Sequence, residues 1–325
     1  MSKIRIGILG TADIALKRFL PALRKCKDFE FVGTASRSLE KAQEFAKTAG
    51  GAVYVGYEEL LKDETIDAVY IPLPPALHYE WAYKALDYGK HVLCEKPFTT
   101  CLEDTKKLVA HADEKKLAVY ENYMFMHHKQ IGAIKNMIAS GEIGKIRLIR
   151  ACFGFPKRAE GDFRYDSRLG GGALLDCGGY TLKLASALLG EEAYVSEASL
   201  IQEEYQVDLF GAAALKNKEG LTAQVSFGMD NAYVCDLSVW GSRGILEAKR
   251  VFTAPSGFQA KVSVLQNGVS VKELEIEDDH FQRSIEYFQS CIHQDEIRNR
   301  EYSDILRQSK LVEDCKKGNL EIFKN

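Results

Sequence analysis

The chain has 325 residues, of which 46% are hydrophobic and 27% are charged, and its formal net charge is −3. This composition is typical of a folded globular protein, and the length exceeds what one compact domain usually holds. A slightly negative chain without a basic stripe is a poor match to a nucleic-acid-binding protein. No apolar run reaches the ~20 residues that span a bilayer, so we expect neither nucleic acid nor membrane as a partner.

The first part of the chain alternates between short apolar runs and amphipathic segments. We predict strands at residues 4–9, 29–35, 52–56, 67–74, 91–97 and 117–125. We predict helices at residues 12–26, 38–50, 57–64, 76–89 and 102–116. Ser38 is a suitable N-cap, and Pro21 is expected to bend the first helix. Repeated βα units of this length indicate a parallel sheet with helices on both faces, which right-handed crossovers make doubly wound.

The pattern changes near residue 122. A helix at 128–144 leads into longer, often alternating strands that are joined by Gly, Asn and Lys turns, which is typical of a mostly antiparallel sheet. These strands are predicted at residues 145–155, 193–204, 207–217, 221–229, 231–242 and 244–250. Helices are predicted at 171–190 and 304–318. We therefore expect a second, α+β domain at 122–325 with a large open sheet, whose last helix packs back on the first domain.

The eight cysteines are scattered along the chain without a C-x-x-C pair. This spacing does not favour a structural zinc site, so we expect no metal. It also indicates reduced thiols rather than a disulfide framework. The first residues lead straight into a predicted strand without a signal-peptide pattern. Together these features predict a cytoplasmic location.

The stretch GTADIA at residues 10–15 follows the first predicted strand and begins the first helix. The dinucleotide fingerprint G-x-G-x-x-G/A belongs at this place, where free N–H groups at a helix start face a pyrophosphate. The middle glycine is replaced by Ala12, so the motif alone also fits an ordinary strand-to-helix turn. The surrounding βα units favour a dinucleotide-binding Rossmann domain at 1–121. Its phosphate contacts are predicted at Gly10, Thr11, Ala12, Asp13 and Ile14.

The second predicted strand ends in Ser36 and Arg37, where an NAD site usually has Asp or Glu for the ribose 2′-hydroxyl. A carboxylate would repel a 2′-phosphate, whereas a hydroxyl and a guanidinium favour one. Lys41, one turn into the next helix, adds positive charge. We therefore predict NADP(H) as the preferred cofactor, with NAD(H) possible. The alternative for Arg37 is a solvated surface charge.

Further candidate cofactor residues follow the later strands. The carboxyl ends of parallel strands meet at one edge of the sheet, where such folds bind ligands. At this edge we place Leu73, Pro74, His78, Glu95, Lys96 and Asn122. In a cleft, the Lys96 ammonium would stabilise developing negative charge or lower the pKa of a neighbouring hydroxyl. The alternatives are that Lys96 pairs with Glu95 and that His78 only caps or packs a helix.

Four motifs, in this order along the chain, resemble the Gfo/Idh/MocA oxidoreductases, the group of glucose-fructose oxidoreductase and inositol dehydrogenase. They are IRIGILGTADIA, ASRSLEKA, CEKP and GGGALLDCGGY. The resemblance covers nearly the whole chain, and EKP together with G-G-x-x-x-D-x-G-x-[HY] is quite specific. It implies that Lys96 is catalytic and contacts substrate and cofactor, and that Tyr180 supplies or removes the proton. Asp176 matches the aspartate of the second motif.

The chemistry of the second motif is consistent with this role. Asp176 and Tyr180 are four residues apart and share one face of a helix. Tyrosine, with a pKa of ~10 in water, is a poor acid-base group at neutral pH, and a nearby ammonium such as that of Lys96 would lower this pKa. Glycines at 170–172 and 178–179 leave space beside the backbone for a ligand. The alternative is a core tyrosine whose glycines permit tight packing.

Residues 121–130 and 163–180 are most similar to the sugar-nucleotide ketoreductases of deoxysugar biosynthesis, which commonly reduce a C3 keto group on a nucleotide-linked hexose. This resemblance implies a hydride from the nicotinamide, a proton from Tyr180 and charge stabilisation by Lys96. The candidate substrate-binding residues are Lys96, Tyr123, His127, Arg164, Tyr165, Arg168, Asp176 and Tyr180. The alternative for His127 is that it only starts a helix, and the alternative for Arg164 is that it is a surface charge.

Two other functions remain open at this point. One is an NADP-dependent dehydrogenase of a free sugar or a trans-dihydrodiol, which shares the same motifs. The other is a non-catalytic, dinucleotide-binding regulator, against which the intact Lys96 and Tyr180 argue. The second-domain sheet of this family commonly pairs with another subunit, so the resemblance also implies a homo-oligomer, either a dimer or a tetramer.

Overall fold

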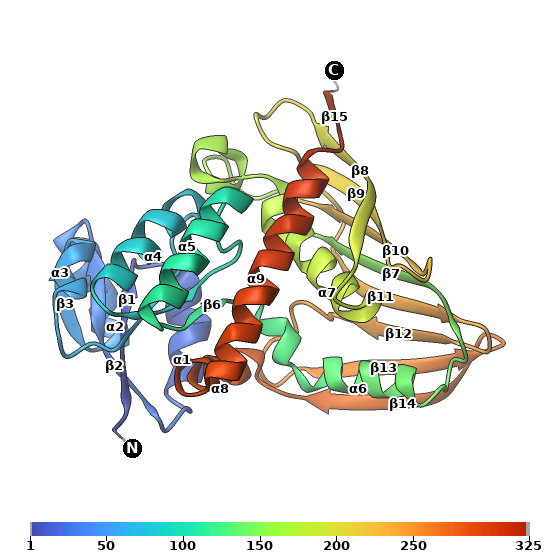
Figure 1. The fold of residues 1–325 in the computed structure, drawn as a ribbon, viewed down its shortest axis with the longest axis horizontal. Helices are drawn as coiled ribbons and strands as arrows, with labels where there is room; N and C mark the ends of the chain where they lie inside the picture. The colour runs from blue at the N-terminus through green and yellow to red at the C-terminus, as the bar shows by residue number, and fades with distance from the viewer. Residues whose placement is uncertain (1, 323–325) are drawn as a thin grey trace. The chain divides into compact units, whose positions relative to one another are not determined.

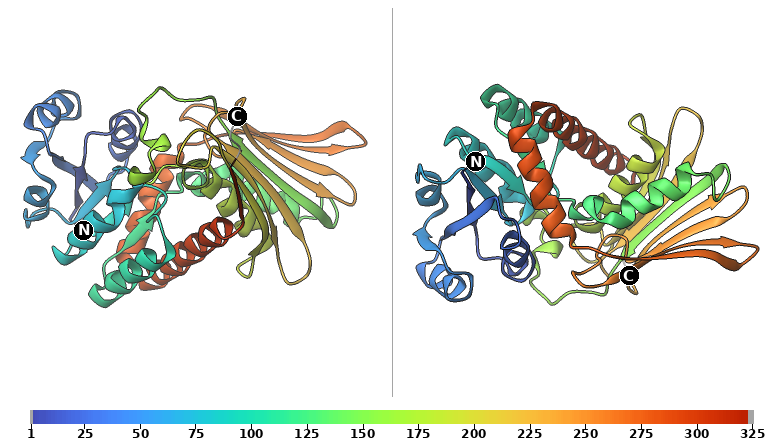
Figure 2. Two further views of the ribbon diagram at one scale, coloured as in Figure 1. Left: turned by 90° about the horizontal axis from the view of Figure 1, so that it is seen from above. Right: turned by 90° about the horizontal axis from the view of Figure 1, so that it is seen from below.

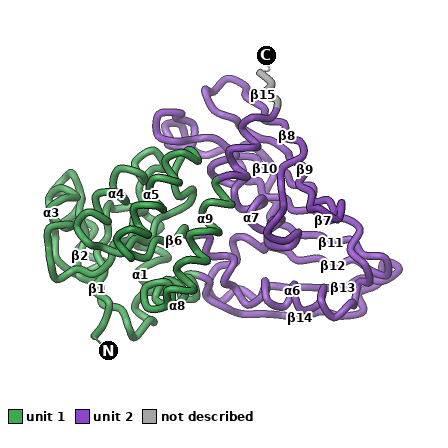
Figure 3. The backbone as a smooth tube through the Cα atoms, viewed as in Figure 1, with its two compact units in different colours: residues 1–122, 281–309 green, residues 123–280, 310–325 purple. Residues whose placement is uncertain are grey.

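The computed structural model describes residues 2–322, which divide into two compact units (Figure 1). Unit 1 comprises residues 1–122 and 281–309, and unit 2 comprises residues 123–280 and 310–325 (Figure 3). The sequence analysis places the first boundary at 121/122. In the structure the chain returns to unit 1 at residue 281, so unit 1 also contains a C-terminal helical segment. Each unit is described separately.

Unit 1 contains a six-stranded sheet in the order β3-β2-β1-β4-β5-β6, in which neighbouring strands are parallel. Its strands are β1 (Ile4–Leu9), β2 (Phe29–Ser36), β3 (Ala52–Val55), β4 (Ala68–Ile71), β5 (His91–Cys94) and β6 (Val119–Glu121). The strand order reverses between β1 and β4, which is the point where open α/β sheets bind ligands. The predicted doubly wound α/β fold is confirmed.

The helical segments of unit 1 follow the predicted pattern with local differences. They are η1 (Ala15–Phe19), α1 (Leu20–Leu23), α2 (Leu39–Ala49), α3 (Tyr57–Leu61), η2 (Pro75–Leu77), α4 (His78–Asp87), α5 (Leu102–Lys115), and the parts of α8 (His280–His293) and α9 (Asp295–Lys316) that lie within residues 281–309. Ser38 caps α2 by accepting a hydrogen bond from Lys41 N at 3.3 Å. The first predicted helix is a π-helical turn that continues directly into α1, with Pro21 just after the junction.

Unit 2 contains a nine-stranded sheet in the order β14-β13-β12-β11-β7-β10-β9-β8-β15. The strands are β7 (Ile146–Gly154), β8 (Tyr194–Gln202), β9 (Phe210–Lys216), β10 (Thr222–Gly228), β11 (Val234–Gly241), β12 (Ile245–Lys249), β13 (Gln259–Gln266), β14 (Val269–Glu277) and β15 (Asn319–Ile322). The sheet is mostly antiparallel, as predicted, with parallel pairs β7/β10 and β8/β15.

Sequence analysis did not assign β13, β14 or α8. The hairpin between β13 and β14 turns at Asn267 and Gly268, which have φ angles of 50° and 78°. An Asn-Gly pair between alternating runs is a strong hairpin signal, so this pair was detectable. The side chains of β14 are almost all exposed, and its apolar alternation is interrupted at Lys272 and Glu273.

The two faces of the unit 2 sheet differ. The helical segments of this unit are η3 (Met124–His127), α6 (Lys129–Ala139), η4 (Phe163–Tyr165), η5 (Ser167–Leu169), η6 (Leu174–Gly178) and α7 (Gly179–Leu189). Among them, α6 packs on β13 and β14, and α7 packs on β7, β9 and β10 (Figure 2). The side chains toward these helices are buried, as at Val225 and Leu237. The opposite face includes Trp240, which is 53% exposed.

No helix in the described part of the chain is long and apolar enough to cross a bilayer. The eight cysteines all lie within the described residues and form no disulfide bond.

Candidate active site

The predicted phosphate turn lies at the switch point of the unit 1 sheet. Gly10 has φ +112°, and a Cβ there would lie 2.9 Å from a methyl carbon of Leu73. A side chain at this position is therefore excluded by both backbone conformation and space. Leu73 follows β4, so the turns after β1 and β4 pack directly against each other.

The remaining residues of the turn lie at its surface. Thr11, Ala12 and Ile14 are half-buried, and the exposed Asp13 pairs with Lys17 at 2.6 Å. Residues 13–23 are continuously helical, so the first N–H groups of this helix follow Gly10 directly. This arrangement fits a pyrophosphate, and these contacts remain a prediction.

The end of β2 presents positive charge without a carboxylate. Ser36 is buried, and its Oγ accepts a hydrogen bond from Ser38 N at 3.2 Å. Arg37 and Lys41 are exposed. A 2′-phosphate would find a guanidinium and an ammonium here. The ribose-side residues predicted from sequence therefore lie together in unit 1.

His78 is 1% exposed and packs inside the edge that carries the candidate cofactor residues. Its Nδ1 lies 2.7 Å from Pro97 O, and its Nε2 lies 2.7 Å from Leu73 O. Burial lowers the pKa of His78 to about 4 against the opposing effect of these carbonyls, and a neutral ring can donate to only one of them. The structure gives His78 a bracing role between two loops. Its contact with a cofactor, like that of the half-buried Pro74, stays a prediction.

Lys96 follows β5, and it is the one half-buried residue in the otherwise buried run 92–99. The preceding Glu95 is 7% exposed and accepts hydrogen bonds from Tyr70 and Asn122. The predicted alternative, a lysine simply paired with its neighbouring glutamate, does not account for these two donors. Burial raises the pKa of Glu95, whereas both hydrogen bonds and the charge of Lys96 act to lower it.

Tyr180 lies in unit 2 at the start of α7 and is 6% exposed. Its ring packs between aromatic rings at centroid distances from 5.2 to 6.0 Å, those of Tyr123, Phe125, Phe153 and Phe252. Its hydroxyl donates to Met124 Sδ at 3.8 Å, which is a weak interaction. The Tyr180 ring is therefore held firmly by aromatic packing.

Asp176 lies one helical turn before Tyr180 and forms an ion pair with Arg164, whose Nε donates to Asp176 Oδ2 at 2.8 Å. Arg164 also donates to Asp162 Oδ1 at 3.0 Å. The guanidinium thus bridges two carboxylates within unit 2. Arg164 is anchored, and the alternative of a solvated surface charge does not fit.

The other predicted substrate residues have distinct environments. Tyr165 accepts a hydrogen bond from Arg158 N at 2.9 Å and donates to Met229 O at 3.2 Å, so its hydroxyl holds the loop. Arg168 is exposed and pairs with Asp166.

Burial lowers the pKa of His127 to about 3, with a smaller effect from the charge of Lys183, so its imidazole is neutral. Substrate contacts by these residues stay predictions.

The glycines before α7 make room for the protein itself. A Cβ on Gly171 would lie 2.3 Å from Arg164 O, and one on Gly172 would lie 2.4 Å from Asp208 Oδ1. At Gly178 it would meet the Phe227 ring at 3.1 Å. The expectation that these glycines leave space for a ligand is therefore wrong at these three positions, where the glycines permit tight packing of the protein instead.

Asp208 is a residue that sequence reasoning missed. Its Oδ2 accepts a hydrogen bond from Leu174 N at 2.7 Å, and its carbonyl accepts one from Ala173 N at 2.8 Å. Asp208 therefore caps the helix that carries Asp176 and Tyr180. The contact joins residues 34 positions apart, and no local pattern in the sequence signals it.

The cap predicts a pH-dependent stability. Burial raises the pKa of Asp208 from 3.8 to about 6. The folded state therefore binds this proton more tightly than the unfolded chain, and the resulting stability is lost as the pH rises from about 4 to about 6. Asn at this position cannot ionise but can accept the hydrogen bond from Leu174 N. We expect the Tm of Asp208→Asn to rise relative to the wild type over this interval, measured by thermal unfolding.

Asp166→Asn is the matched control, because the hydrogen bonds from Arg168 lower the pKa of Asp166. The difference in Tm between Asp166→Asn and the wild type should change little over the same pH interval. Parallel curves for Asp208→Asn and the wild type would show that burial does not raise the pKa of Asp208 in the folded protein.

Comparisons with known proteins agree with this architecture. The profile described as "Oxidoreductase family, NAD-binding Rossmann fold" matches residues 4–123, and the "GFO/IDH/MocA C-terminal domain" matches residues 131–247. Together the two matches describe an NAD(P)-dependent oxidoreductase with a Rossmann domain and a separate C-terminal domain. The chain belongs to the Gfo/Idh/MocA oxidoreductase family.

Individual relatives narrow the comparison. The chain is 40% identical to dTDP-3,4-didehydro-2,6-dideoxy-alpha-D-glucose 3-reductase of Actinomadura kijaniata, over 98% of this chain and 97% of the relative. It is 32% identical to D-xylose 1-dehydrogenase (NADP(+)) 2 of Haloferax volcanii, over 88% of each. The solved structure of a 3-ketoreductase from Actinomadura kijaniata with NADP and TDP-benzene has a TM-score of 0.95, 38% identity and full coverage of both chains.

Proposed function

We propose that the protein is an NADPH-dependent reductase of a keto group on a nucleotide-linked hexose. The nicotinamide, when bound, supplies the hydride. Tyr180 donates its hydroxyl proton to the carbonyl oxygen, and the Lys96 ammonium stabilises the negative charge that develops there. Arg164 and Asp176 orient the sugar from the substrate unit. The predicted C3 position is the one named for the similar reductase.

The observation that supports this proposal most is full-length similarity to a 3-reductase of a dTDP-linked deoxysugar. Variants of the similar 3-ketoreductase, solved with NADP and TDP-benzene, include a lysine replaced by alanine and a tyrosine replaced by phenylalanine. These two residues are separated along that chain by the same number of positions as Lys96 and Tyr180. The correspondence supports the assignment of the catalytic pair.

The direct test is turnover with purified protein. NADPH and a dTDP-linked keto-hexose should give a steady loss of reduced-nicotinamide absorbance, with a hydroxylated sugar nucleotide as product. Turnover of NADP+ with D-xylose or a trans-dihydrodiol, and none with the keto-hexose, would instead select the dehydrogenase, which the similarity to a D-xylose 1-dehydrogenase favours as second candidate. Tight NADPH binding without turnover of any substrate would indicate a regulator.

The end of β2 supports NADPH over NADH. We expect Arg37→Ala to weaken NADPH binding about 10- to 100-fold, because the guanidinium forms charge-assisted bonds only with the 2′-phosphate. NADH binding should change little. Fluorescence titration of both cofactors measures the two dissociation constants, and Arg18→Ala, an exposed arginine on η1, is the control. Equal losses for NADPH and NADH would show that Arg37 does not select the phosphate.

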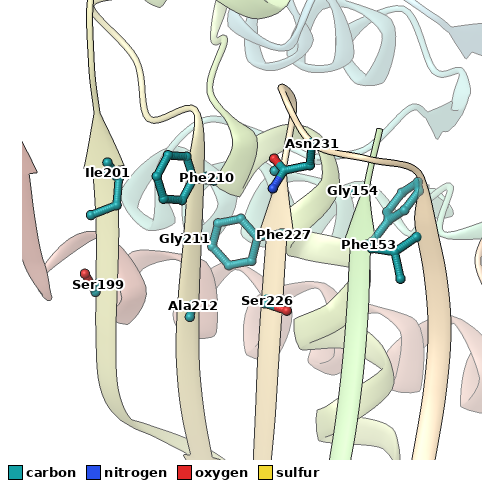
Figure 4. A pocket seen from close by; sticks show the side chains of 12 residues that line it. Phe153, Gly154, Ser199, Ile201, Phe210, Gly211, Ala212, Ser226, Phe227 and Asn231 are labelled. Carbon is teal, nitrogen blue, oxygen red and sulfur yellow. The ribbon is translucent and has the colours of Figure 1, made fainter. Parts of the chain in front are cut away.

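We also infer that a second copy of the chain covers the open face of the unit 2 sheet, giving a homo-oligomer. This face carries exposed Trp240 and Phe210. It also contains a pocket of about 370 Å³ whose lining includes Phe210, Ala212, Ser226 and Asn231 (Figure 4). Small and aromatic side chains at one surface are typical of sites that bury against a partner. Sedimentation as a monomer at micromolar concentration would contradict this inference.

A further inference from the structure

Three buried polar side chains meet at the ends of adjacent strands of unit 1. Tyr70 on β4 donates its hydroxyl hydrogen to Glu95 Oε1 at 2.7 Å, and Asn122 Nδ2 donates to the same oxygen at 2.7 Å. Tyr70 and Asn122 are 0% exposed, and Glu95 is 7% exposed. Glu95 follows β5 and Asn122 follows β6, so one carboxylate oxygen ties together the ends of three neighbouring strands.

This cluster is one of several anchors around Lys96. On its N-terminal side, Glu95 N donates to Ile71 O at 3.1 Å. On its C-terminal side, Pro97 O contacts the His78 ring, and Phe98 N donates to Glu121 Oε1 at 2.8 Å. Lys96 is thus flanked by fixed residues on both sides. Of the contacts described here, the one made by the Glu95 side chain is the only one that involves a tyrosine hydroxyl.

The Tyr70 hydroxyl has no packing role that phenylalanine would not fill. The Tyr70 ring stacks on Phe19 at a centroid distance of 3.8 Å, with 17° between the ring planes. A fully buried hydroxyl loses its bonds to water, so its presence needs a compensating partner. That partner is the Glu95 carboxylate, to which a hydrogen bond from a neutral donor is charge-assisted and strong.

The two donors also influence the charge of Glu95. Burial raises the pKa of the carboxyl, and the hydrogen bonds from Tyr70 and Asn122 act in the opposite direction. The charged and titratable groups near Glu95 are Lys96, which favours its ionised form, and Glu121, Cys94 and Tyr120. Without the Tyr70 hydroxyl, the buried carboxylate would keep one side-chain donor and would gain by protonation or by rotation away from its site.

We propose that Tyr70 is a positioning residue for Lys96 and that it acts through Glu95. This inference rests on the catalytic role proposed for Lys96. Glu95 and Lys96 are consecutive residues directly after β5, so movement of the Glu95 anchor shifts the backbone from which the lysine extends. Misplacement of a reacting group by about 1 Å can cost about 100-fold in rate, so the hydroxyl affects turnover without contacting substrate or cofactor.

The test is Tyr70→Phe, which removes the hydroxyl and keeps the ring stack. Tyr54→Phe is a closely matched control, because Tyr54 on β3 donates to Asp63 Oδ2 at the same 2.7 Å and lies in the edge strand of the same sheet. Both variants should lower Tm, and Tyr70→Phe more than Tyr54→Phe, because Tyr70 is 0% exposed and Tyr54 is half-buried. We expect kcat to fall about 10- to 100-fold in Tyr70→Phe only, with the Kd for NADPH within about 3-fold of the wild type.

A second measurement does not depend on activity. Hydrogen exchange of the unliganded protein should accelerate in peptides covering residues 94–100 in Tyr70→Phe, and stay at wild-type rates there in Tyr54→Phe. Unchanged hydrogen exchange in Tyr70→Phe would overturn the anchoring role, whether or not the wild type is active. Absence of turnover in the wild type would refute the proposed function and leave the exchange test intact. Equal kcat in the two variants, with an active wild type, would show that the anchor does not serve Lys96.

Discussion

Replacing Lys96 by methionine is expected to lower kcat about 100- to 1,000-fold while NADPH binding stays measurable. Methionine keeps an unbranched apolar side chain of similar length in this half-buried position, but it carries no charge. In the wild type the ammonium stabilises the negative charge that develops on the carbonyl oxygen. Removal of a single donor of this kind typically lowers kcat about 100- to 1,000-fold. Steady-state kinetics with the dTDP-linked keto-hexose measures kcat, and fluorescence titration measures the Kd for NADPH.

Lys107→Met is the matched control for the lysine substitution. Lys107 lies on α5 of the same unit and forms an exposed ion pair with Glu103 at 3.6 Å, which contributes little to stability. We expect wild-type kcat and Kd in this variant. If Lys96→Met turned over at the wild-type rate, Lys96 would have no part in the chemistry. A loss of both kcat and NADPH binding would instead assign Lys96 to cofactor binding.

Sequence patterns predicted the structure correctly where neighbouring residues along the chain determine it. The N-cap at Ser38 and the left-handed Gly50 after α2 lie within a few residues of the groups they serve. The parallel sheet of unit 1 follows from repeated buried runs separated by amphipathic helices. By contrast, the predicted sixth strand at 117–125 is shortened to Val119–Glu121, because residues 124–127 form a 3-10 turn. Apart from Glu121 and Asn122 this run is apolar, and an apolar run does not distinguish strand from turn.

The candidate site divides in the same way. Lys96 and Tyr180 became candidates because EKP and GGGALLDCGGY resemble motifs of a known family, whereas the residues alone also fit an ion pair and a core tyrosine. Tyr70 and Asp208 were not found, since each acts through a partner 25 or 34 residues away. Likewise, the sequence could not show that the His78 nitrogens lie on two backbone carbonyls or that the Tyr165 hydroxyl holds a loop. Side-chain partners across strands depend on register, which no single segment specifies.

Replacing Tyr180 by phenylalanine is expected to lower kcat about 100- to 10,000-fold, the range in which a positioned general acid contributes. The packing argues for an effect confined to the chemistry. The four aromatic rings around Tyr180 contact a phenylalanine equally well, and the hydrogen bond that the hydroxyl donates to the Met124 thioether is weak. Tm should therefore change by no more than a few degrees.

The control for the tyrosine substitution is Tyr194→Phe, on β8 of the same unit, where the side chain is 47% exposed. The two variants are compared by steady-state kinetics, thermal unfolding and NADPH titration. A specific loss of kcat in Tyr180→Phe, with Tm and Kd unchanged, assigns the proton to the Tyr180 hydroxyl. Retained turnover would mean that another group protonates the carbonyl oxygen.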